Sequence, residues 1–370
     1  MLTRLLLGAV LVISAACAPA ASPAATPTQP AGAPAPQTTA PTAPAASTAQ
    51  GAAASGGMDH VRFATTAGAS GSAPVYIALE RGYFKQANVD VELVSFPGGA
   101  QMIPSIAASQ VEIANTDAGA GLLNAIARDL PARFVADGAS CTVGHCTASF
   151  LVRKQLVDSG AFKDLGDLRG KTVNTFTPGS TLYMYLYRML DKAGLKQTDL
   201  NLQVLTFDQV LPAFTTGAMD ASWQIDPFTT QGIAQGIAAK VGDAAELLGP
   251  QQSTVIVYSP TFATQQPDVG KRFMLGYLRG IRDYDDAFIQ GKDRDAIVDV
   301  LVKYTNLKDP GLFEKIGLPN FDPNGKIIID SLKANQDWYV GHGDVPTPID
   351  LDKVYDTAFI DYAVSQLGGR

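Results

Sequence analysis

The sequence predicts an α/β protein built from two consecutive blocks of alternating strands and helices. From Val61 onward, short apolar strands alternate with helical segments, which is typical of a largely parallel sheet with helices on both faces. Many of the strands end in loops of small residues, where open parallel sheets bind ligands. The alternation then restarts near Phe150. The chain therefore contains a second set of the same structural units.

The first block opens with the stretch VRFATTAGASGSAPVYIALERGYF, residues 61–84. We expect a strand at 61–64, a loop at 65–73 and a helix that Pro74 opens and Gly82 ends. This order exposes backbone N–H groups to a ligand. The block continues with expected strands at 89–95, 111–115 and 132–137 and helices at 101–109 and 122–128.

The second block extends over residues 149–247, and a mainly helical segment follows it. Strands are expected at 150–153, 171–176, 201–206 and 219–224, with helices at 182–193 and 208–216. A further strand at 253–258 precedes expected helices at 267–291, 294–304, 327–340 and 351–367. In the first of these, Tyr277, Ile281, Tyr284 and Phe288 share one helix face, which predicts a core stripe.

The front of the chain predicts export followed by a tether. Arg4 precedes an apolar run at 5–16, too short for a stable membrane anchor, and small residues lead into Cys17. We expect residues 1–17 to be a lipoprotein signal peptide with Cys17 as the lipidation site. Ser14 departs from the leucine usual there, so ordinary cleavage is the alternative. Residues 18–57 lack charged and aromatic side chains, which predicts a disordered tether rich in Ala, Pro and Thr.

Charge and cysteine content limit the partners of the folded part. A net charge of −7 and an isoelectric point near 5.0 argue against nucleic acid. Cys141 and Cys146, in CTVGHC, are close enough to form a disulfide in an oxidising compartment. Free thiols are one alternative. A metal site that adds His145 is the other, and it is disfavoured because a usual zinc site has a second ligand pair. We therefore predict no metal.

Five stretches indicate a family. They are APVYIALERGYF, DVELVSFPGGAQMIPSIAASQVEIANTDAGA, DLRGKTVNTFTPGST, GAMDASWQIDPF and FMLGYLRGIRDYDDAF. In their order and spacing, residues 59–368 resemble the periplasmic solute-binding proteins of ABC importers in the nitrate, sulfonate and thiamine-pyrimidine-precursor (NMT1/THI5-like) family. The resemblance implies a two-lobed, type II-like fold with a ligand cleft between the lobes. Residues 58–138 and 253–370 would form lobe 1, residues 149–247 lobe 2, and residues 139–148 and 248–252 the hinge crossovers. A disulfide at Cys141 and Cys146 would stiffen the first crossover.

The resemblance also implies where a ligand binds. Carried over position by position, the family's cleft is lined here by Ser70, Gly71, Ser72, Tyr76, Pro97, Gly98, Thr116, Asp117, Ser180, Thr181, Trp223 and Asp226. Several of these positions have a purely structural alternative. Ser180 or Thr181 is a good N-cap, and Asp117 could cap the helix that follows it. Asp226 precedes a proline, and its role could be limited to shaping a turn.

The candidate loops suggest a ligand class. They contain no Lys, Arg or His, but they contain two carboxylates and aromatic rings, with Tyr183 or Tyr185 nearby. Carboxylates accept hydrogen bonds and rings stack on flat molecules. We therefore expect a planar, donor-bearing or cationic ligand, such as an aminopyrimidine or another heteroaromatic, vitamin-like compound. Because helix N-termini can hold anions without basic side chains, a sulfonate, an aromatic carboxylate or nitrate is the alternative.

The expected function is that of an exported, lipid-anchored and monomeric binding protein that delivers its small-molecule ligand to an ABC permease. It would have no cofactor and no enzymatic activity. A pyrimidine-synthase-like enzyme is an alternative, but that branch of the family carries a cysteine-rich motif and a cofactor-binding lysine and works inside cells. A hydrolase is disfavoured, because no GxSxG motif is present. A sensor domain is a further alternative that the sequence does not separate from import.

Overall fold

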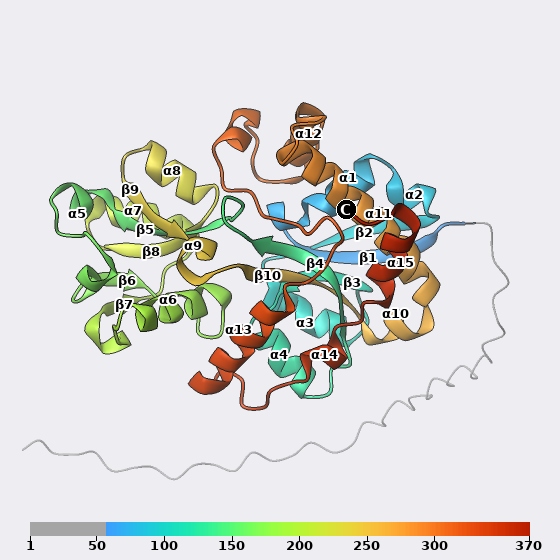
Figure 1. Cartoon of the computed structure of the whole chain (residues 1–370), viewed down its shortest axis with the longest axis horizontal. Helices are drawn as coiled ribbons and strands as arrows, with labels where there is room; N and C mark the ends of the chain where they lie inside the picture. The colour runs from blue at the N-terminus through green and yellow to red at the C-terminus, as the bar shows by residue number, and fades with distance from the viewer. Residues whose placement is uncertain (1–56) are drawn as a thin grey trace, which may run out of the picture. The chain divides into compact units, whose positions relative to one another are not determined.

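A computed structural model describes residues 57–370 of the chain (Figure 1). The expected signal peptide, its Cys17 and nearly all of the expected tether lie outside the described residues. Within residues 57–370, no helix combines the length and the apolar character needed to cross a bilayer.

The first of two five-stranded sheets has the strand order β2-β1-β3-β10-β4. Its strands are β1 (Asp59–Thr66), β2 (Val89–Phe96), β3 (Ile113–Asp117), β4 (Arg133–Cys141) and β10 (Gln251–Tyr258). β1 pairs in parallel with β2 and β3, whereas β10 pairs antiparallel with β3 and β4. β1 to β4 therefore share one direction and β10 runs against them. We call this sheet and the helices packed on it the first lobe.

The second sheet repeats this plan with the order β7-β6-β8-β5-β9. Its strands are β5 (Ala148–Arg153), β6 (Thr172–Asn174), β7 (Asn201–Gln203), β8 (Ala221–Ile225) and β9 (Ala238–Asp243). β6 pairs in parallel with β7 and β8, and β5 pairs antiparallel with β8 and β9. This sheet and its helices form the second lobe.

The reversed strand of each sheet is the one that arrives from the other lobe. The chain leaves the first sheet through β4 and enters the second through β5, and it returns through β9 into β10. The expected parallel character thus holds for most strands, and both crossover strands are antiparallel. β4 continues to Cys141 and β10 begins at Gln251, so both strands extend into the segments that we expected as hinges.

Helices flank both sheets (Figure 1). The helices of the first lobe are α1 (Ala73–Glu80), α2 (Tyr83–Gln86), α3 (Gly99–Ala107), α4 (Ala120–Ala127), α10 (Pro260–Gln265), α11 (Pro267–Phe288), α12 (Arg294–Tyr304), α14 (Leu351–Val354) and α15 (Ala358–Leu367). Those of the second are α5 (Lys154–Asp158), α6 (Thr181–Lys192), α7 (Phe207–Thr216), α8 (Phe228–Ala234) and α9 (Ala244–Leu248). The helix expected at 351–367 is divided into α14 and α15 by residues 355–357.

α11 forms the centre of one face of the first lobe. The expected stripe is buried at Tyr277, Ile281 and Tyr284, whereas Phe288 is only partly buried. α11 packs against α1, α2 and α15. At Gly280 a Cβ atom would lie 2.0 Å from the carbonyl oxygen of Pro74, so only glycine allows α1 and α11 to approach so closely.

α13 (Ile329–His342) contacts both lobes. It packs against α4 and β10 of the first lobe and against α6 of the second. Its Trp338 ring centroid lies 6.1 Å from that of Tyr183 on α6, and the Arg188 guanidinium of α6 donates a 2.6 Å hydrogen bond to the Asn335 side-chain oxygen. The segment 253–370, which we expected to belong wholly to the first lobe, therefore also contacts the second.

Candidate ligand-binding site

Two neighbouring cavities lie where the lobes meet. The larger, which we call the apolar cavity, has a volume of about 560 Å³. Most of its wall comes from the second lobe, at the ends of β6 and β8, the N-terminal turn of α6 and the segment before and into α7. Asp117, Ser253 and Thr254 of the first lobe and Thr147 of the crossover before β5 complete it. Its volume suits a small organic molecule.

The aromatic wall of the apolar cavity depends on an unusual backbone conformation. Phe176, two residues after β6, has a φ of +61°, which is uncommon for a bulky residue and marks local strain. The Asn174 side-chain oxygen accepts from the N–H groups of Phe176 and Leu205, at 3.3 and 3.1 Å, and so holds two cavity-lining loops together. The Phe176 ring then packs against Phe207, with centroids 5.6 Å apart.

The second cavity, which we call the polar cavity, has a volume of about 460 Å³. The N-terminal turns of α3 and α4 form one side, and residues 177–180 before α6 form the other. Neither Gly98 nor Gly119, the N-cap residues of α3 and α4, supplies a side-chain cap. The two cavities share Asp117, Thr177 and Ser180, so these residues stand at the junction between them.

Asp117 connects the lobes at this junction. It ends β3 in the first lobe, and its carboxylate accepts a hydrogen bond from the hydroxyl of Thr181, the first residue of α6 in the second lobe. Burial raises the pKa of the Asp117 carboxyl, while hydrogen bonds from the Thr181 hydroxyl and backbone oppose that shift. The Asp117 side chain therefore contacts the N-terminus of α6, and it does not cap α4, the helix that follows it in sequence.

A backbone contact accompanies this side-chain contact. The Ala120 N–H, at the start of α4, donates to the carbonyl oxygen of Gly179 in the second lobe at 3.2 Å. Gly179 has a φ of +79°, which glycine adopts without strain. A Cβ atom on Gly119 would lie 3.0 Å from both the Gly179 carbonyl oxygen and an Asp117 carboxylate oxygen. Small residues on both sides thus allow the lobes to touch.

Side chains of the chain itself make hydrogen bonds at both helix N-termini beside the apolar cavity. Ser180 Oγ accepts from the Tyr183 N–H at 3.3 Å at the start of α6, in addition to the Asp117 contact. At α7, Gln209 accepts from the Thr206 N–H at 3.0 Å, and the Thr206 hydroxyl donates to the Asp208 carboxylate at 2.6 Å. None of the described residues that line either cavity is Lys, Arg or His. The electrostatic environment is therefore acidic and rich in hydrogen-bond acceptors.

Three of the twelve predicted ligand-binding residues line these cavities, namely Asp117, Ser180 and Thr181. The first predicted loop, Ser70, Gly71 and Ser72, forms a short 3-10 helix that lines neither of them. Ser72 is buried, with its Oγ 2.6 Å from the Thr65 hydroxyl. Tyr76 is only 2% exposed, and its ring stacks on Tyr304 with centroids 5.1 Å apart. It lies in the core of the first lobe.

The remaining predicted residues lie near the cavities or in the hinge. Pro97 and Gly98 directly precede Gly99 in the polar cavity without lining it themselves. Thr116 is buried, and its hydroxyl donates to the Gly99 carbonyl at 3.3 Å. Trp223 is fully buried between Phe150 and Tyr185, at centroid distances of 5.5 Å. It supports the wall of the site and lines neither cavity.

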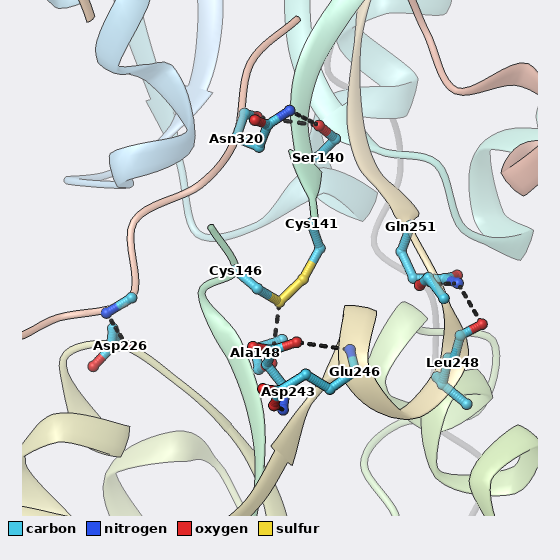
Figure 2. Close-up of a disulfide and its surroundings, with 12 residues drawn as sticks. Ser140, Cys141, Cys146, Ala148, Asp226, Asp243, Glu246, Leu248, Gln251 and Asn320 are labelled. Atoms are coloured by element: carbon cyan, nitrogen blue, oxygen red, sulfur yellow. Dashed lines mark hydrogen bonds between the residues drawn. A yellow bond between two sulfur atoms is a disulfide. The ribbon is translucent and has the colours of Figure 1, made fainter. Parts of the chain in front are cut away.

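Asp226 joins the second lobe to a segment of the first. One carboxylate oxygen accepts from the N–H and hydroxyl of Thr230, at 3.0 and 2.6 Å, and the other accepts from the Gly317 N–H at 2.7 Å. Gly317 lies between Ile316 and Leu318, which belong to the core of the first lobe. Figure 2 shows Asp226 beside this connection. Burial raises the pKa of the Asp226 carboxyl, and the hydrogen bonds from Thr230 and Gly317 oppose the shift.

Cys141 and Cys146 form a disulfide in the structure (Figure 2). Cys141 ends β4 and Cys146 lies two residues before β5, so the disulfide links the two ends of a short loop within the connection between the lobes. The neighbouring Ser140 and Asn320 exchange backbone hydrogen bonds of 2.9 Å, which attach the C-terminal segment to the same region. Among residues 57–370, no cluster of side chains that could hold a metal ion is present.

Several lining residues were not among those predicted from sequence. They are mainly apolar residues of the second lobe, with some hydroxyls: Thr147, Ala148, Phe176, Leu182, Val204, Leu205, Thr206, Phe207, Ser253 and Thr254, whereas Tyr185 was expected only as a residue near the site. Spacing in the sequence could have indicated some of the lining residues. Tyr185 is four residues after Thr181 and therefore on the same helix face, and Phe176 directly precedes the loop that opens α6.

The sequence comparison assigns the chain to a family. The family model described as NMT1/THI5 like matches residues 69–286, which is more than half of the chain. The chain belongs to the NMT1/THI5-like family. This NMT1/THI5-like chain is also 30% identical over 161 residues to the protein of Escherichia coli (strain K12) named "Putative aliphatic sulfonates-binding protein". That match covers 42% of the chain and 46% of the relative, so it spans about half of the relative's length.

Solved structures confirm the fold of the NMT1/THI5-like chain. The periplasmic aliphatic sulphonate binding protein SsuA from Escherichia coli matches with a TM-score of 0.65 and 19% identity, over 80% of this chain and 97% of that one. The periplasmic nitrate-binding protein NrtA from Synechocystis PCC 6803 matches with a TM-score of 0.68 and 15% identity, over 84% and 89%. At these identities the likeness concerns the fold, which is that of periplasmic binding proteins.

Proposed function

We propose that this chain is an exported substrate-binding protein of an ABC importer, which captures a small organic ligand between its lobes and delivers it to a membrane permease. The observation that carries the proposal is the pair of cavities that meet at Asp117 and Ser180, residues of different lobes. A ligand that contacts residues of both lobes would favour the closed arrangement of the lobes. The closed arrangement is the state that a permease can recognise. Family membership and fold support the same function.

We further propose that the ligand has a flat, apolar body and carries hydrogen-bond donors, as an aminopyrimidine or another heteroaromatic compound does. Phe176 and Phe207 offer ring surfaces for such a body. Asp117 and the threonine hydroxyls offer acceptors for its N–H groups. An anion placed in the apolar cavity would instead face the carboxylate of Asp117, with no basic side chain among the described lining residues.

An organic anion is the second candidate, and one observation favours it. The N-termini of α3 and α4 carry no side-chain caps and line the polar cavity, where their N–H groups could hold a sulfonate or carboxylate. The relative named for aliphatic sulfonates supports this candidate too.

A thermal-shift screen of the purified chain tests the proposal. The panel comprises aminopyrimidines, flavins, aromatic acids, taurine-like sulfonates and nitrate, and calorimetry follows each compound that raises the melting temperature. We expect saturable binding of one class with a stoichiometry of one. Binding of sulfonates alone would establish the second candidate. If every compound leaves the melting temperature unchanged at millimolar concentration, the capture proposal for these ligand classes is wrong.

We also propose that lipid on Cys17 holds the protein at the outer face of the cell membrane. The short apolar run before Cys17 and the uncharged segment at 18–57 support this proposal. In cells labelled with a radioactive fatty acid, the wild-type chain is expected to carry label and to sediment with membranes. The Cys17→Ser variant is expected to lose both properties. Equal labelling of the two proteins would contradict the proposal.

A further inference from the structure

Tyr185 on α6 lines the apolar cavity and carries a buried hydroxyl that no other residue of the described chain uses. The residue is 1% exposed and lines the cavity. Its hydroxyl has no hydrogen-bond partner among residues 57–370. Ser253 lies close enough to influence the pKa of this hydroxyl, but the two groups do not meet hydrogen-bond geometry. Buried hydroxyls nearly always have partners, so an unsatisfied one at a cavity wall indicates a ligand contact.

The surroundings of Tyr185 define what that contact recognises. Thr181 is one turn earlier on α6 and donates a hydrogen bond to Asp117. Burial is the main cause of the raised pKa of the Tyr185 hydroxyl, and the nearby Asp117 carboxylate raises it further. Tyr339 of α13 is fully buried beside the same carboxylate, and its hydroxyl also has no partner within the described chain. We call Asp117, Thr181, Tyr185 and Tyr339 the Asp117 cluster. It contains oxygen atoms from three separate elements of both lobes.

The nearest basic group along α6 makes its hydrogen bonds outside the cavities. Arg188, three residues after Tyr185, donates to the side-chain oxygens of Gln251 at 3.1 Å and Asn335 at 2.6 Å. It lines neither cavity. The Arg188 guanidinium therefore holds α6 against β10 and α13, and its charge opposes the burial that raises the pKa of the Tyr185 hydroxyl, without placing a donor in either cavity. An N–H group of a ligand would meet only oxygen acceptors from the cluster.

We propose that the Tyr185 hydroxyl is a ligand-binding group which, together with the Asp117 carboxylate, accepts hydrogen bonds from a nitrogen-bearing head of the ligand, such as an amidine, an amino-heterocycle or an amide. The apolar body of the ligand then occupies the cavity between Phe176 and Phe207. This inference rests on the proposed capture function and names the head group. The Asp117 carboxylate selects ligands with N–H donors over ligands of the same shape with an anionic head, and the Tyr185 hydroxyl adds a second acceptor for the selected head.

The test uses three probes with one aromatic body: 2-naphthamidine, 2-naphthamide and naphthalene-2-sulfonate. Calorimetry with the full chain compares wild type, Tyr185→Phe and Tyr187→Phe. Tyr187 is the matched control, because its hydroxyl lies 3.0 Å from the Thr175 hydroxyl and the residue does not line the cavity. We expect wild type to bind the amidine and the amide more tightly than the sulfonate. Tyr185→Phe should weaken amidine binding about tenfold to hundredfold, the usual effect of losing a hydrogen bond to a charged group. Tyr187→Phe should leave it unchanged.

Stability separates a lost contact from a damaged fold. Removing an unpartnered hydroxyl should leave the melting temperature of ligand-free Tyr185→Phe unchanged or higher, whereas Tyr187→Phe should lower it. Equal amidine affinity of wild type and Tyr185→Phe would overturn the role of Tyr185 and leave the capture function in place. Binding of the sulfonate alone would overturn the head-group assignment and would support the anion candidate. Binding of none of the three probes would overturn the inference, whereas the capture proposal is decided by the separate metabolite screen.

Discussion

The Asp226 carboxylate of the second lobe accepts a 2.7 Å hydrogen bond from the backbone N–H of Gly317, which belongs to a segment buried in the first lobe. This contact lies beside the disulfide and outside both ligand cavities. Asp117 and Thr181 make the corresponding contact at the ligand site. These are two of the contacts that join the lobes, and of the two only the contact at Asp117 lies at the ligand cavities.

Replacement of Asp226 is expected to affect stability and to leave ligand binding unchanged. In Asp226→Asn the side chain keeps one acceptor oxygen, so either Thr230 or Gly317 loses its partner and faces an NH₂ group. Such a loss costs about 1–3 kcal/mol of unfolding free energy. Urea denaturation measures this cost, and Asp268→Asn, whose side chain is 90% exposed, is the control. Weaker ligand binding at unchanged stability would instead make Asp226 a ligand contact.

Gly317 is expected to tolerate no side chain. A Cβ atom there would lie 2.2 Å from the Cys146 carbonyl oxygen and 2.8 Å from the Asp226 carboxylate. Gly317→Ala should therefore lower the unfolding free energy by about 1–3 kcal/mol, as overpacking does elsewhere. Gly341→Ala is the matched control, because a Cβ atom at this position in α13 has no neighbour within 4 Å. The control should be neutral or slightly stabilising. Equal effects of the two variants would show that the segment at Gly317 moves easily.

The sequence predicted the positions at which the lobes meet better than it predicted the side chains that line the site. Asp117, Ser180 and Thr181 follow strands or begin a helix at the binding edge, so topology alone places them at the cavities. Tyr76 and Trp223 have suitable chemistry, but their direction depends on packing. Tyr76 lies on α1, where every residue from Ala73 to Ala78 is buried, so no polar face indicates its direction. Trp223 alternates with the polar Ser222 and Gln224, but these side chains are buried too, because helices cover both faces of the sheet.

Other lining residues depend on tertiary contacts that no local pattern specifies. Phe176 lines the cavity because Asn174 holds the following loop in a left-handed conformation. α13 reaches α6 because the C-terminal segment returns across both lobes, and only this return brings Tyr339 to Asp117. Tyr339 and Asp117 are too far apart in the sequence for any helical or strand periodicity to relate them. The cavity as a whole therefore required the structure.

Reduction of the disulfide is expected to destabilise the connection between the lobes modestly. Cys141 and Cys146 are five residues apart, and on the chain-entropy argument a loop of this size contributes about 2 kcal/mol. Denaturation with and without a reducing agent measures this contribution. The double variant Cys141→Ser, Cys146→Ser should match the reduced protein and should not respond to the reductant. A double variant as stable as the oxidised protein would show that the bridge is dispensable for folding.

Asp137 is expected to make stability depend on pH in the neutral range. It is fully buried in β4, where its carboxylate accepts from the Gln252 amide at 2.6 Å and from the Asp322 N–H at 2.8 Å. Burial raises its pKa from 3.8 to about 7, the two hydrogen bonds oppose the shift, and the Asp322 carboxylate adds to it. Tyr277 and Tyr355 also face this group.

The direction of the effect follows from proton binding. Between pH 3.8 and about 7 the folded protein holds a proton on Asp137 that the unfolded chain releases. The stability contributed by this proton is therefore complete below pH 3.8 and is lost as the pH rises through about 7. Asp137→Asn cannot ionise and lacks this loss, although its single side-chain oxygen can replace only one of the two acceptors that serve the Gln252 amide and the Asp322 N–H. The stability advantage of wild type over Asp137→Asn, measured by guanidinium denaturation, should shrink steadily from pH 4 to pH 8. An advantage that is constant or grows over this range would show that Asp137 is ionised in the folded protein throughout.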